Sequence, residues 1–266
     1  MSFRSLVRKV LSRPKTDTEK LIAEASKAPR YQNHTFHFRG MYFAVTDFIS
    51  VAWQLKEFFD DGRLAFQTKS ESPVIFDCGA NVGVSVIYFK KLFPQAKIKA
   101  FEPDPKVFAC LTENLKRSSI SNVELINKAV WNSNDGVSFG SEGADGGSIY
   151  FEGNKVSLPS VRLREMLAAE KKIDLLKMDI EGAEVDVLKD CGSELKKVKY
   201  LFVEYHSWIS SEQRLDELLN LLKENGFRYY IHQIGEIVNA PFMERKFTNG
   251  MDIQLDIHAI NEHDQE

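Results

Sequence analysis

The stretch Val74-Ile75-Phe76-Asp77-Cys78-Gly79-Ala80-Asn81-Val82-Gly83 decides the fold class. Its apolar run at 74–76 predicts a buried strand, and a glycine-bearing turn over 77–83 follows. Apolar residues at helical spacing over 84–93 then predict a helix, and 98–101 predicts a second strand. Strand, turn, helix and strand form a β-α-β unit, which is typical of a parallel sheet.

The alternation of strands and helices continues toward the C-terminus. Further strands are predicted over 123–130, 173–178, 200–205, 227–232 and 251–259. The segment 132–156 is rich in Gly, Ser, Asn and Asp, which predicts a hairpin and loop in place of a crossover helix. The last two strands are joined without a helix and can be antiparallel. We predict an α/β, doubly wound, mostly parallel sheet with an antiparallel C-terminal strand pair.

The N-terminal 70 residues carry a different pattern. Residues 1–15 form a short basic amphipathic stripe, which is consistent with membrane-surface docking, with an organellar presequence or with a helix that caps the domain. Residues 31–67 are rich in aromatic side chains, and their spacing changes from alternating to helical near Thr46. We predict a strand-then-helix cap over 1–70 and a main domain over 71–266.

Composition excludes several function classes. The 38 acidic and 35 basic residues give a net charge of −3, so no nucleic-acid partner is expected. The three cysteines are far apart and odd in number, which favours neither a disulfide framework nor a zinc site. We predict a cytoplasmic protein, with peripheral membrane contact through residues 1–15 as an alternative.

In a parallel sheet the ligand binds beyond the carboxyl ends of the strands. Function is therefore expected at 77–83, 102–104, 127–129, 179–184 and 204–206. The 77–83 turn precedes a helix whose free amides can hold an anion. Glu102 ends the second strand, where a carboxylate can accept hydrogen bonds from a ribose diol. Only Gly79 and Gly83 are present in the turn, one residue off the G-x-G-x-x-G spacing of dinucleotide sites.

Four motifs together resemble one family. Residues 75–83, Ala100-Phe101-Glu102-Pro103-Asp104, Lys177-Met178-Asp179-Ile180-Glu181-Gly182-Ala183-Glu184 and Glu204-Tyr205-His206 resemble the FkbM family of S-adenosylmethionine-dependent methyltransferases over about residues 73–227. The resemblance implies a class I methyltransferase (Rossmann-like) sheet. It also implies O-methylation of a hydroxyl on a sugar, a glycan precursor or another small metabolite.

The resemblance also implies cofactor contacts. The turn residues Asp77, Gly79, Asn81 and Gly83 would hold the methionine portion of S-adenosylmethionine. Glu102 would bind its ribose, with Asp104 assisting nearby. The adenine would lie near Asn127, Lys128 and Ala129, although Lys128 is more typical of a solvated surface lysine.

Acidic residues follow two neighbouring predicted strands, and they carry the expected chemistry. We predict Asp179, His206 and Glu204 as catalytic residues, with either Asp179 or His206 as the base that takes the proton of the acceptor hydroxyl. An alternative is a divalent metal such as Mg²⁺ held by Asp179, Glu181, Glu204 and His206.

Three neighbouring residues have simpler interpretations. Glu181 and Glu184 could serve only to stabilise the start of a helix through its dipole. Lys177 is either a partner of the acidic cluster or a side chain that extends past the sheet.

Two competing functions remain at this point. One is a NAD-dependent oxidoreductase, against which the missing third glycine and the Asp-Ile-Glu-Gly turn argue. The other is a cofactor-binding module without catalysis, which would have no need for Asp179 and His206.

Overall fold

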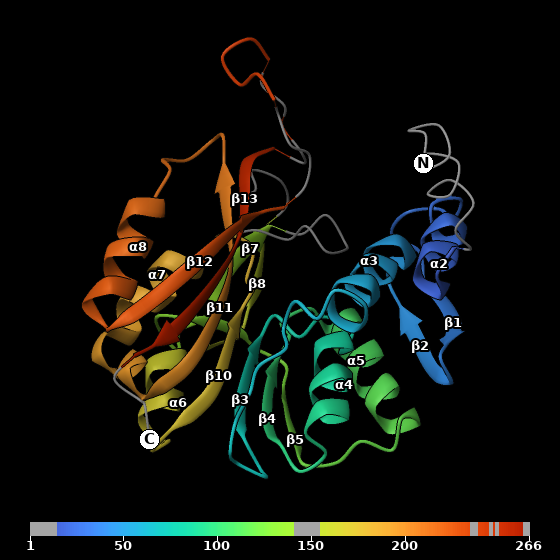
Figure 1. Ribbon diagram of the computed structural model, residues 1–266, viewed down its shortest axis with the longest axis horizontal. Helices are drawn as coiled ribbons and strands as arrows, with labels where there is room; N and C mark the ends of the chain where they lie inside the picture. The colour runs from blue at the N-terminus through green and yellow to red at the C-terminus, as the bar shows by residue number, and fades with distance from the viewer. Residues whose placement is uncertain (1–14, 141–154, 235–238, 245–246, 248–249, 263–266) are drawn as a thin grey trace, which may run out of the picture.

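The computed structural model describes residues 15–140, 155–234, 239–244, 247 and 250–262. Within them a seven-stranded sheet has the order β12-β13-β11-β10-β3-β4-β5 (Figure 1). Its strands are β3 (Val74–Cys78), β4 (Lys97–Phe101), β5 (Val123–Ile126), β10 (Ile173–Met178), β11 (Val198–Trp208), β12 (Phe227–Gln233) and β13 (Met251–Asn261). Strand β13 lies between β11 and β12 and is antiparallel to both, whereas β11, β10, β3, β4 and β5 pair in parallel. This confirms the predicted sheet and its antiparallel C-terminal pair.

Helices cover both faces of the sheet, as expected for a doubly wound fold. The helices of the main domain are α4 (Val84–Leu92), α5 (Pro105–Arg117), α6 (Leu163–Ala168), α7 (Glu184–Cys191), the 3-10 helix η1 (Gly192–Lys197) and α8 (Leu215–Glu224). Side chains alternate between the faces, so Ile75 and Leu175 pack with α4 and α5, whereas Phe76 and Leu176 pack with α6, α7 and α8. Figure 1 shows these two layers on opposite sides of the sheet.

The described part of the N-terminal cap contains α2 (Asp17–Ala25), β1 (His34–Phe38), β2 (Met41–Val45) and α3 (Phe48–Phe59). The change to helical spacing near Thr46 is confirmed, but the single strand is a hairpin. Arg39 and Gly40 have φ of 48° and 78°, a left-handed pair that suits a tight turn. The predicted stripe over 1–15 lies almost entirely outside the described residues.

The cap packs into the main core through a buried amide and a shared apolar cluster. Asn114 of α5 accepts a hydrogen bond from the Ala44 amide and donates to the carbonyls of Ala44 and Val82. Cap residues such as Phe43 and Leu55 belong to the same buried cluster as Ile75 and Leu111. These contacts anchor the cap beside the 77–83 turn. The division of the chain into two domains at residue 70 stays a prediction.

Between β5 and β10 the structure differs from the prediction in detail. The strand predicted over 123–130 is split into β5 and β6 (Ala129–Trp131), because the chain turns at Asn127 and β6 pairs with β9 (Ser160–Arg162) outside the main sheet. The hairpin predicted over 132–156 is confirmed as β7 (Val137–Gly140) paired with β8 (Lys155–Leu158); residues 141–154 lie outside the described residues. Helix α6 was not predicted.

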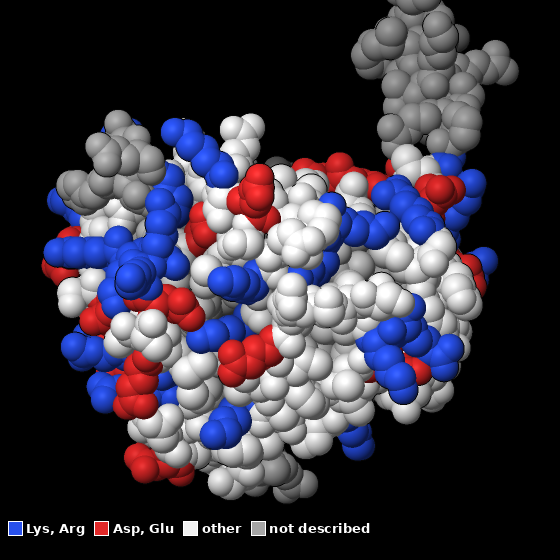
Figure 2. All heavy atoms as spheres, turned by 90° about the horizontal axis from the view of Figure 1, so that it is seen from below, with Lys and Arg blue, Asp and Glu red and all other residues white. Residues whose placement is uncertain are grey.

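Charge on the surface is mixed. The face seen in Figure 2 carries acidic side chains among the basic ones. No helix in the described ranges has the length and apolar character needed to cross a bilayer.

Candidate active site

The strand order brings the predicted site residues to one edge of the sheet. Glu102 follows β4, Asp77 lies in β3, Asp179 follows β10, and Glu204 and His206 lie in β11. Because β4, β3, β10 and β11 are consecutive neighbours in the sheet, their carboxyl ends form one continuous edge. The structure therefore gathers residues that are up to 129 positions apart, from Asp77 to His206 (206 − 77), into one region.

The amides of the 77–83 turn are bonded within the chain. Five successive N–H groups donate as follows: Gly79 and Ala80 to the Phe101 carbonyl, Asn81 to Glu102 Oε2, Val82 to Asn81 Oδ1 and Gly83 to the Ala80 carbonyl. These five turn amides therefore have partners within the chain, and the expected anion contact through the free amides at the start of α4 stays a prediction.

Gly79 has a packing reason for being glycine. Its φ is 83°, and a Cβ there would lie 1.8 Å from the Asp179 carbonyl oxygen. The Asp179 amide donates to the Cys78 carbonyl at 3.1 Å. Gly79 therefore lets β3 and β10 meet at their carboxyl ends, and this close approach positions Asp179.

Asp77 is buried and paired rather than open to a ligand. Ser85 Oγ donates to its Oδ2 at 2.5 Å, and Lys177 Nζ lies 3.3 Å from its Oδ1. Lys177 also donates to the Gly79 carbonyl at 2.8 Å and lies 3.4 Å from Asp179 Oδ2. Of the two interpretations of Lys177, the structure shows a partner of the acidic cluster.

Glu102 has a fixed carboxylate at the end of β4. Its side chain accepts the amides of Asn81 at 3.1 Å and Asp104 at 2.9 Å, and the residue is 8% exposed. Asn127 Nδ2 donates to the Glu102 carbonyl at 2.8 Å. Two amides thus hold the carboxylate in one orientation, which fits a group that accepts hydrogen bonds from a diol.

The other predicted cofactor contacts have structural roles here. Asp104 caps α5, accepting the amides of Lys106 and Val107 through Oδ1. Ala129 is buried in β6, and its amide donates to the Pro159 carbonyl. Lys128 is exposed, as expected of a surface lysine.

His206 is buried among carboxylates. Its Nδ1 lies 3.0 Å from Glu184 Oε1, and its Nε2 lies 3.7 Å from Glu181 and 3.5 Å from Glu204. Burial lowers the pKa of His206, but the charges of Glu181 and Glu184 and the bond to Glu184 outweigh it and hold that pKa well above its usual value. His206 is thus protonated at neutral pH, which makes it a poor base for the acceptor.

Asp179 has the ionisation expected of a base. Burial and the charge of Glu204 raise the pKa of Asp179 to about 6, even though Lys177 and His206 act in the opposite direction. A carboxylate with this pKa is mainly ionised at pH 7 and is more basic than an ordinary aspartate. Of the two predicted bases, the electrostatics favour Asp179.

Glu181 and Glu204 flank His206 but differ in ionisation. Burial raises the pKa of Glu181 well above its usual value. Burial acts in the same direction on Glu204, but hydrogen bonding to His206 and the charges of His206 and Lys177 outweigh it, so the pKa of Glu204 is lowered. Gln254 of β13 donates to Glu204 Oε1, which orients that carboxylate.

Three of the predicted metal ligands lie close together. One atom each from Asp179, Glu181 and His206 can be chosen so that all three lie within 4.8 Å of one another. An ion there would have to displace the proton from the His206 nitrogen that binds it. The donor set of two carboxylates and one imidazole suits a small divalent cation.

Glu184 does more than the helix-dipole interpretation allows. It does begin α7, but it is 1% exposed, and its Oε1 accepts the amides of Ile180 and Gly182 as well as contacting His206. Its position in the sequence, three residues after Glu181 at the start of the helix that follows β10, was the signal that could have placed Glu184 in the site. Gln254, in a strand without a recognised motif, offered no such signal.

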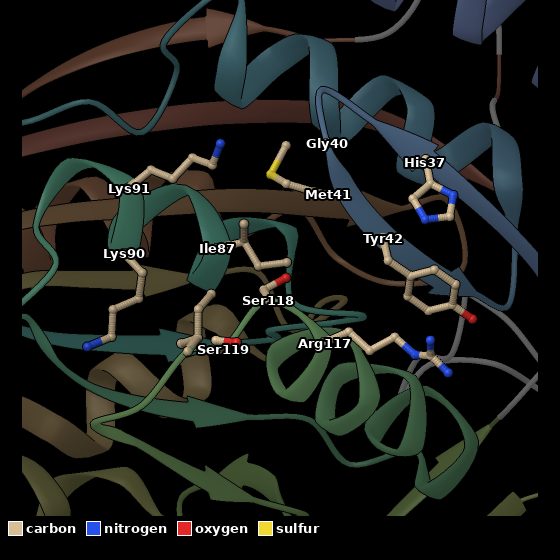
Figure 3. A pocket seen from close by; sticks show the side chains of 11 residues that line it. His37, Gly40, Met41, Tyr42, Ile87, Lys90, Lys91, Arg117, Ser118 and Ser119 are labelled. Atoms are coloured by element: carbon tan, nitrogen blue, oxygen red, sulfur yellow. The ribbon is translucent and has the colours of Figure 1, made fainter.

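A separate surface cavity of about 660 Å³ contains none of these residues (Figure 3). It lies between the cap hairpin and the C-terminal ends of α4 and α5, and its lining includes Tyr42, Lys90, Lys91 and Arg117. Lys90 Nζ bonds to the Ala96 carbonyl and Arg117 pairs with Glu113, so these two of its cations already have partners. This cavity is remote from the predicted chemistry.

Comparison with known proteins decides the family. Residues 77–229 match the model of the methyltransferase FkbM domain, which covers more than half of the chain. The chain belongs to the FkbM methyltransferase family. The match covers the turn, the β4 end, the β10 turn and the β11 end, so the family predicted from the four motifs is confirmed.

Curated relatives of this FkbM methyltransferase carry the same general activity in their names. Methyltransferase sdnD of Sordaria araneosa is 30% identical over 70% of this chain and 85% of its own length. The 2-O-methyltransferase NoeI of Sinorhizobium fredii is 31% identical over 54% of this chain and 66% of its own. The hexuronic acid methyltransferase AglP of Haloferax volcanii is 27% identical over 55% of this chain and 62% of its own.

Proposed function

We propose that this FkbM methyltransferase transfers a methyl group from S-adenosylmethionine to a hydroxyl of a saccharide, with Asp179 as the base. The observation that carries the proposal is the Asp179 carboxylate, held at the end of β10 with a pKa raised to about 6 by burial and by Glu204. The name of NoeI, a 2-O-methyltransferase, supports methylation of an oxygen. The name of AglP, a hexuronic acid methyltransferase, supports a saccharide as the acceptor.

The cofactor would lie over the ends of β3 and β4. Glu102 would accept hydrogen bonds from the ribose hydroxyls, since the amides of Asn81 and Asp104 hold its carboxylate in one orientation at the end of β4. Asn127 would contribute indirectly, by holding the Glu102 and Pro103 carbonyls. When bound, S-adenosylmethionine supplies an electrophilic methyl group on a sulfonium.

The residues around Asp179 would then prepare the acceptor. Asp179 would take the proton of the acceptor hydroxyl and keep it on its carboxyl, while bound S-adenosylmethionine would supply the methyl group that the oxygen receives and would leave as S-adenosylhomocysteine. Glu204 orients the hydroxyl. Protonated His206 is a positioning residue, because it keeps Glu204 ionised and is itself held by Glu184.

A divalent ion is a second candidate element of the same reaction, favoured by the spacing of Asp179, Glu181 and His206. Such an ion would lower the pKa of the acceptor hydroxyl directly. Treatment with EDTA followed by addition of Mg²⁺ distinguishes a metal-free reaction, with Asp179 as the base, from a reaction that needs the ion. With Asp179 as the base, EDTA leaves the transfer rate unchanged; loss of activity that Mg²⁺ restores assigns the cluster to a metal.

The experiment that tests the function uses the purified chain with labelled S-adenosylmethionine and a panel of methyl glycosides, including hexuronic acids. We expect S-adenosylhomocysteine to form together with an O-methylated sugar that mass spectrometry detects. Thermal shift with S-adenosylmethionine and with NAD provides the cofactor control, and only the former should raise the melting temperature. Stabilisation by NAD alone, or transfer to no hydroxyl in the panel, would overturn the proposal.

A further inference from the structure

A second polar group extends the site onto the cap and the last strand. Glu57 is in α3, Arg63 is in the turn that follows it, and Asp256 is in β13. Arg63 Nη1 lies 3.3 Å from Glu57 Oε1 and 3.0 Å from Asp256 Oδ2. We call Glu57, Arg63 and Asp256 the cap triad. No sequence motif covered its two cap members.

The cap triad adjoins the catalytic cluster through Asp256. In the antiparallel pairing of β11 and β13, Asp256 lies directly opposite Glu204, so both side chains project from the same face of the sheet. Like charges at directly opposed positions destabilise a sheet. Burial first, and then the charge of Glu204, raises the pKa of Asp256 to about 8.

The charges of the catalytic cluster also affect the pKa of Glu57, on the cap. Burial raises the pKa of Glu57 to about 7, with Glu204 and Asp179 adding to the rise and Arg63 opposing it. The side chains of Glu57 and Arg63 are 27% and 22% exposed, so a ligand at the edge can reach them. Among the described residues, the cap is linked to this end of the sheet by the Arg63 pair with Asp256 and by the His258 contact to the Arg63 carbonyl.

The cap triad has unused hydrogen-bonding capacity. Asp256 is 1% exposed, yet its Oδ1 has no hydrogen-bond partner among the described residues. Both ion pairs of Arg63 use Nη1. A buried polar atom without a hydrogen-bond partner destabilises the folded chain. A bound ligand that supplies this partner would remove the destabilisation, which gives the unpartnered Asp256 Oδ1 a physical explanation.

The triad is also held rigidly in place. The Arg63 amide donates to the Glu57 carbonyl at 3.0 Å, and His258 Nε2 lies 2.9 Å from the Arg63 carbonyl. Burial lowers the pKa of His258, so the neutral ring donates this bond from Nε2. The turn that carries Arg63 is thereby fixed to β13, next to Asp256.

We propose that the cap triad is the acceptor-recognition subsite, which binds a second hydroxyl of the acceptor beside the one that is methylated. The strand order supports this placement, because Glu102 of β4 lies on one side of Asp179 and Asp256 of β13 on the other. A hydroxyl can donate to the partly exposed Glu57 carboxylate and accept from Arg63 at once, and a small movement of these two side chains would open the buried Asp256 Oδ1 to it. The inference rests on the proposed function and narrows the acceptor to one with neighbouring hydroxyls.

The test pairs changes in the protein with changes in the sugar. Three variants, Asp256→Asn, Arg63→Lys and Glu57→Gln, are compared with Asp190→Asn, which alters a carboxylate that pairs with Arg162 on the other side of the sheet. The substrates are the best methyl glycoside of the panel and its monodeoxy analogues. S-adenosylhomocysteine binding is measured by calorimetry, and sugar binding to that complex by saturation-transfer NMR.

At about pH 9, above the raised pKa of Asp256, we expect the wild-type kcat/KM to fall on the order of 10- to 100-fold for one deoxy sugar, as for a lost hydrogen bond to a charged partner. Asp256→Asn should lower kcat/KM for the parent sugar by a similar factor. In this variant the parent and deoxy sugars should then have nearly the same kcat/KM. Affinity for S-adenosylhomocysteine should not change in any variant, and Asp190→Asn should behave as wild type.

The outcomes separate this inference from the function on which it rests. A wild-type enzyme that methylates sugars, together with triad variants that keep the parent KM and the full deoxy penalty, overturns the subsite alone. Triad variants that weaken S-adenosylhomocysteine binding as much as sugar binding also overturn it, since the triad would then belong to the cofactor site. Absence of transfer to any glycoside overturns both proposals. Because Glu57 is partly exposed, Glu57→Gln keeps the test available should Asp256→Asn fail to fold.

Discussion

Replacing Glu184 by Gln should destabilise the fold in a pH-dependent way, because Glu184 forms a buried ion pair with His206. The substitution keeps an acceptor for the amides of Ile180 and Gly182 and removes only the charge that faces His206. Deleting one partner of a buried pair costs about 3–5 kcal/mol when the other charge is left alone. Here Glu181 and Glu204 still lie within 4 Å of His206 Nε2, so we expect a smaller loss of about 2 kcal/mol.

The sign of the pH dependence follows from the pKa of His206. Burial lowers this pKa, but Glu181 and Glu184 raise it by more, so it stands above its usual value. Stability from a raised histidine pKa is fully present below the unfolded value near 6.5 and is lost as pH rises through the folded value. The difference in unfolding free energy between wild type and Glu184→Gln should therefore be about 2 kcal/mol near pH 6. It should shrink in alkaline solution.

Urea unfolding at a series of pH values measures this difference. The matched control is Glu194→Gln, which removes a partly exposed partner of Lys197 and should change stability by at most about 1 kcal/mol at every pH. A Glu184→Gln effect that is absent near pH 6, or that grows as the solution becomes alkaline, would refute the assignment of His206 as a buried cation.

Two further predictions concern the turn and the cofactor. Gly79→Ala should destabilise the chain by more than about 4 kcal/mol, because the Cβ would meet the Asp179 carbonyl at 1.8 Å. Gly40→Ala, with φ of 78° and no atom within 4 Å, should lose only about 1–2 kcal/mol, and equal losses in thermal unfolding would contradict the close-approach argument. Glu102→Ala should weaken S-adenosylhomocysteine binding by about 1.5–3 kcal/mol in calorimetry. The exposed Glu124→Ala should not weaken it, and unchanged affinity in both variants would remove Glu102 from the cofactor site.

The sheet was predictable from the sequence because its signals are local. The apolar run 74–76, the turn with Gly79 and the next predicted strand, 98–101, lie within 28 residues (101 − 74 + 1), and they predict one β-α-β unit. The split of β5 from β6 was not predictable in the same way. It depends on Asn127 bonding to carbonyls 24 and 25 residues away and on β6 pairing with β9.

The site was predictable as a set of motifs but not in its ionisation. The sequence placed Asp179 and His206 on neighbouring strand ends, and the structure brings them together. Which of them is the base depends on distances that no motif specifies, namely those from His206 to Glu181, Glu184 and Glu204. The cap triad escaped prediction because Arg63, in the turn after α3, pairs with Asp256 of β13 only in the folded chain, across 193 positions of sequence (256 − 63).

The pH dependence of single-turnover methyl transfer, in wild type and in Asp179→Asn, tests the role of Asp179 most directly. The wild-type rate should fall as pH decreases through about 6, since burial and Glu204 raise the pKa of Asp179 to that value and the base must be ionised. Asp179→Asn should slow transfer by roughly 10²–10⁴ and lose this acid limb, with S-adenosylhomocysteine affinity within a few-fold of wild type. An Asp179→Asn enzyme that transfers at the wild-type rate with the same pH profile would contradict the account.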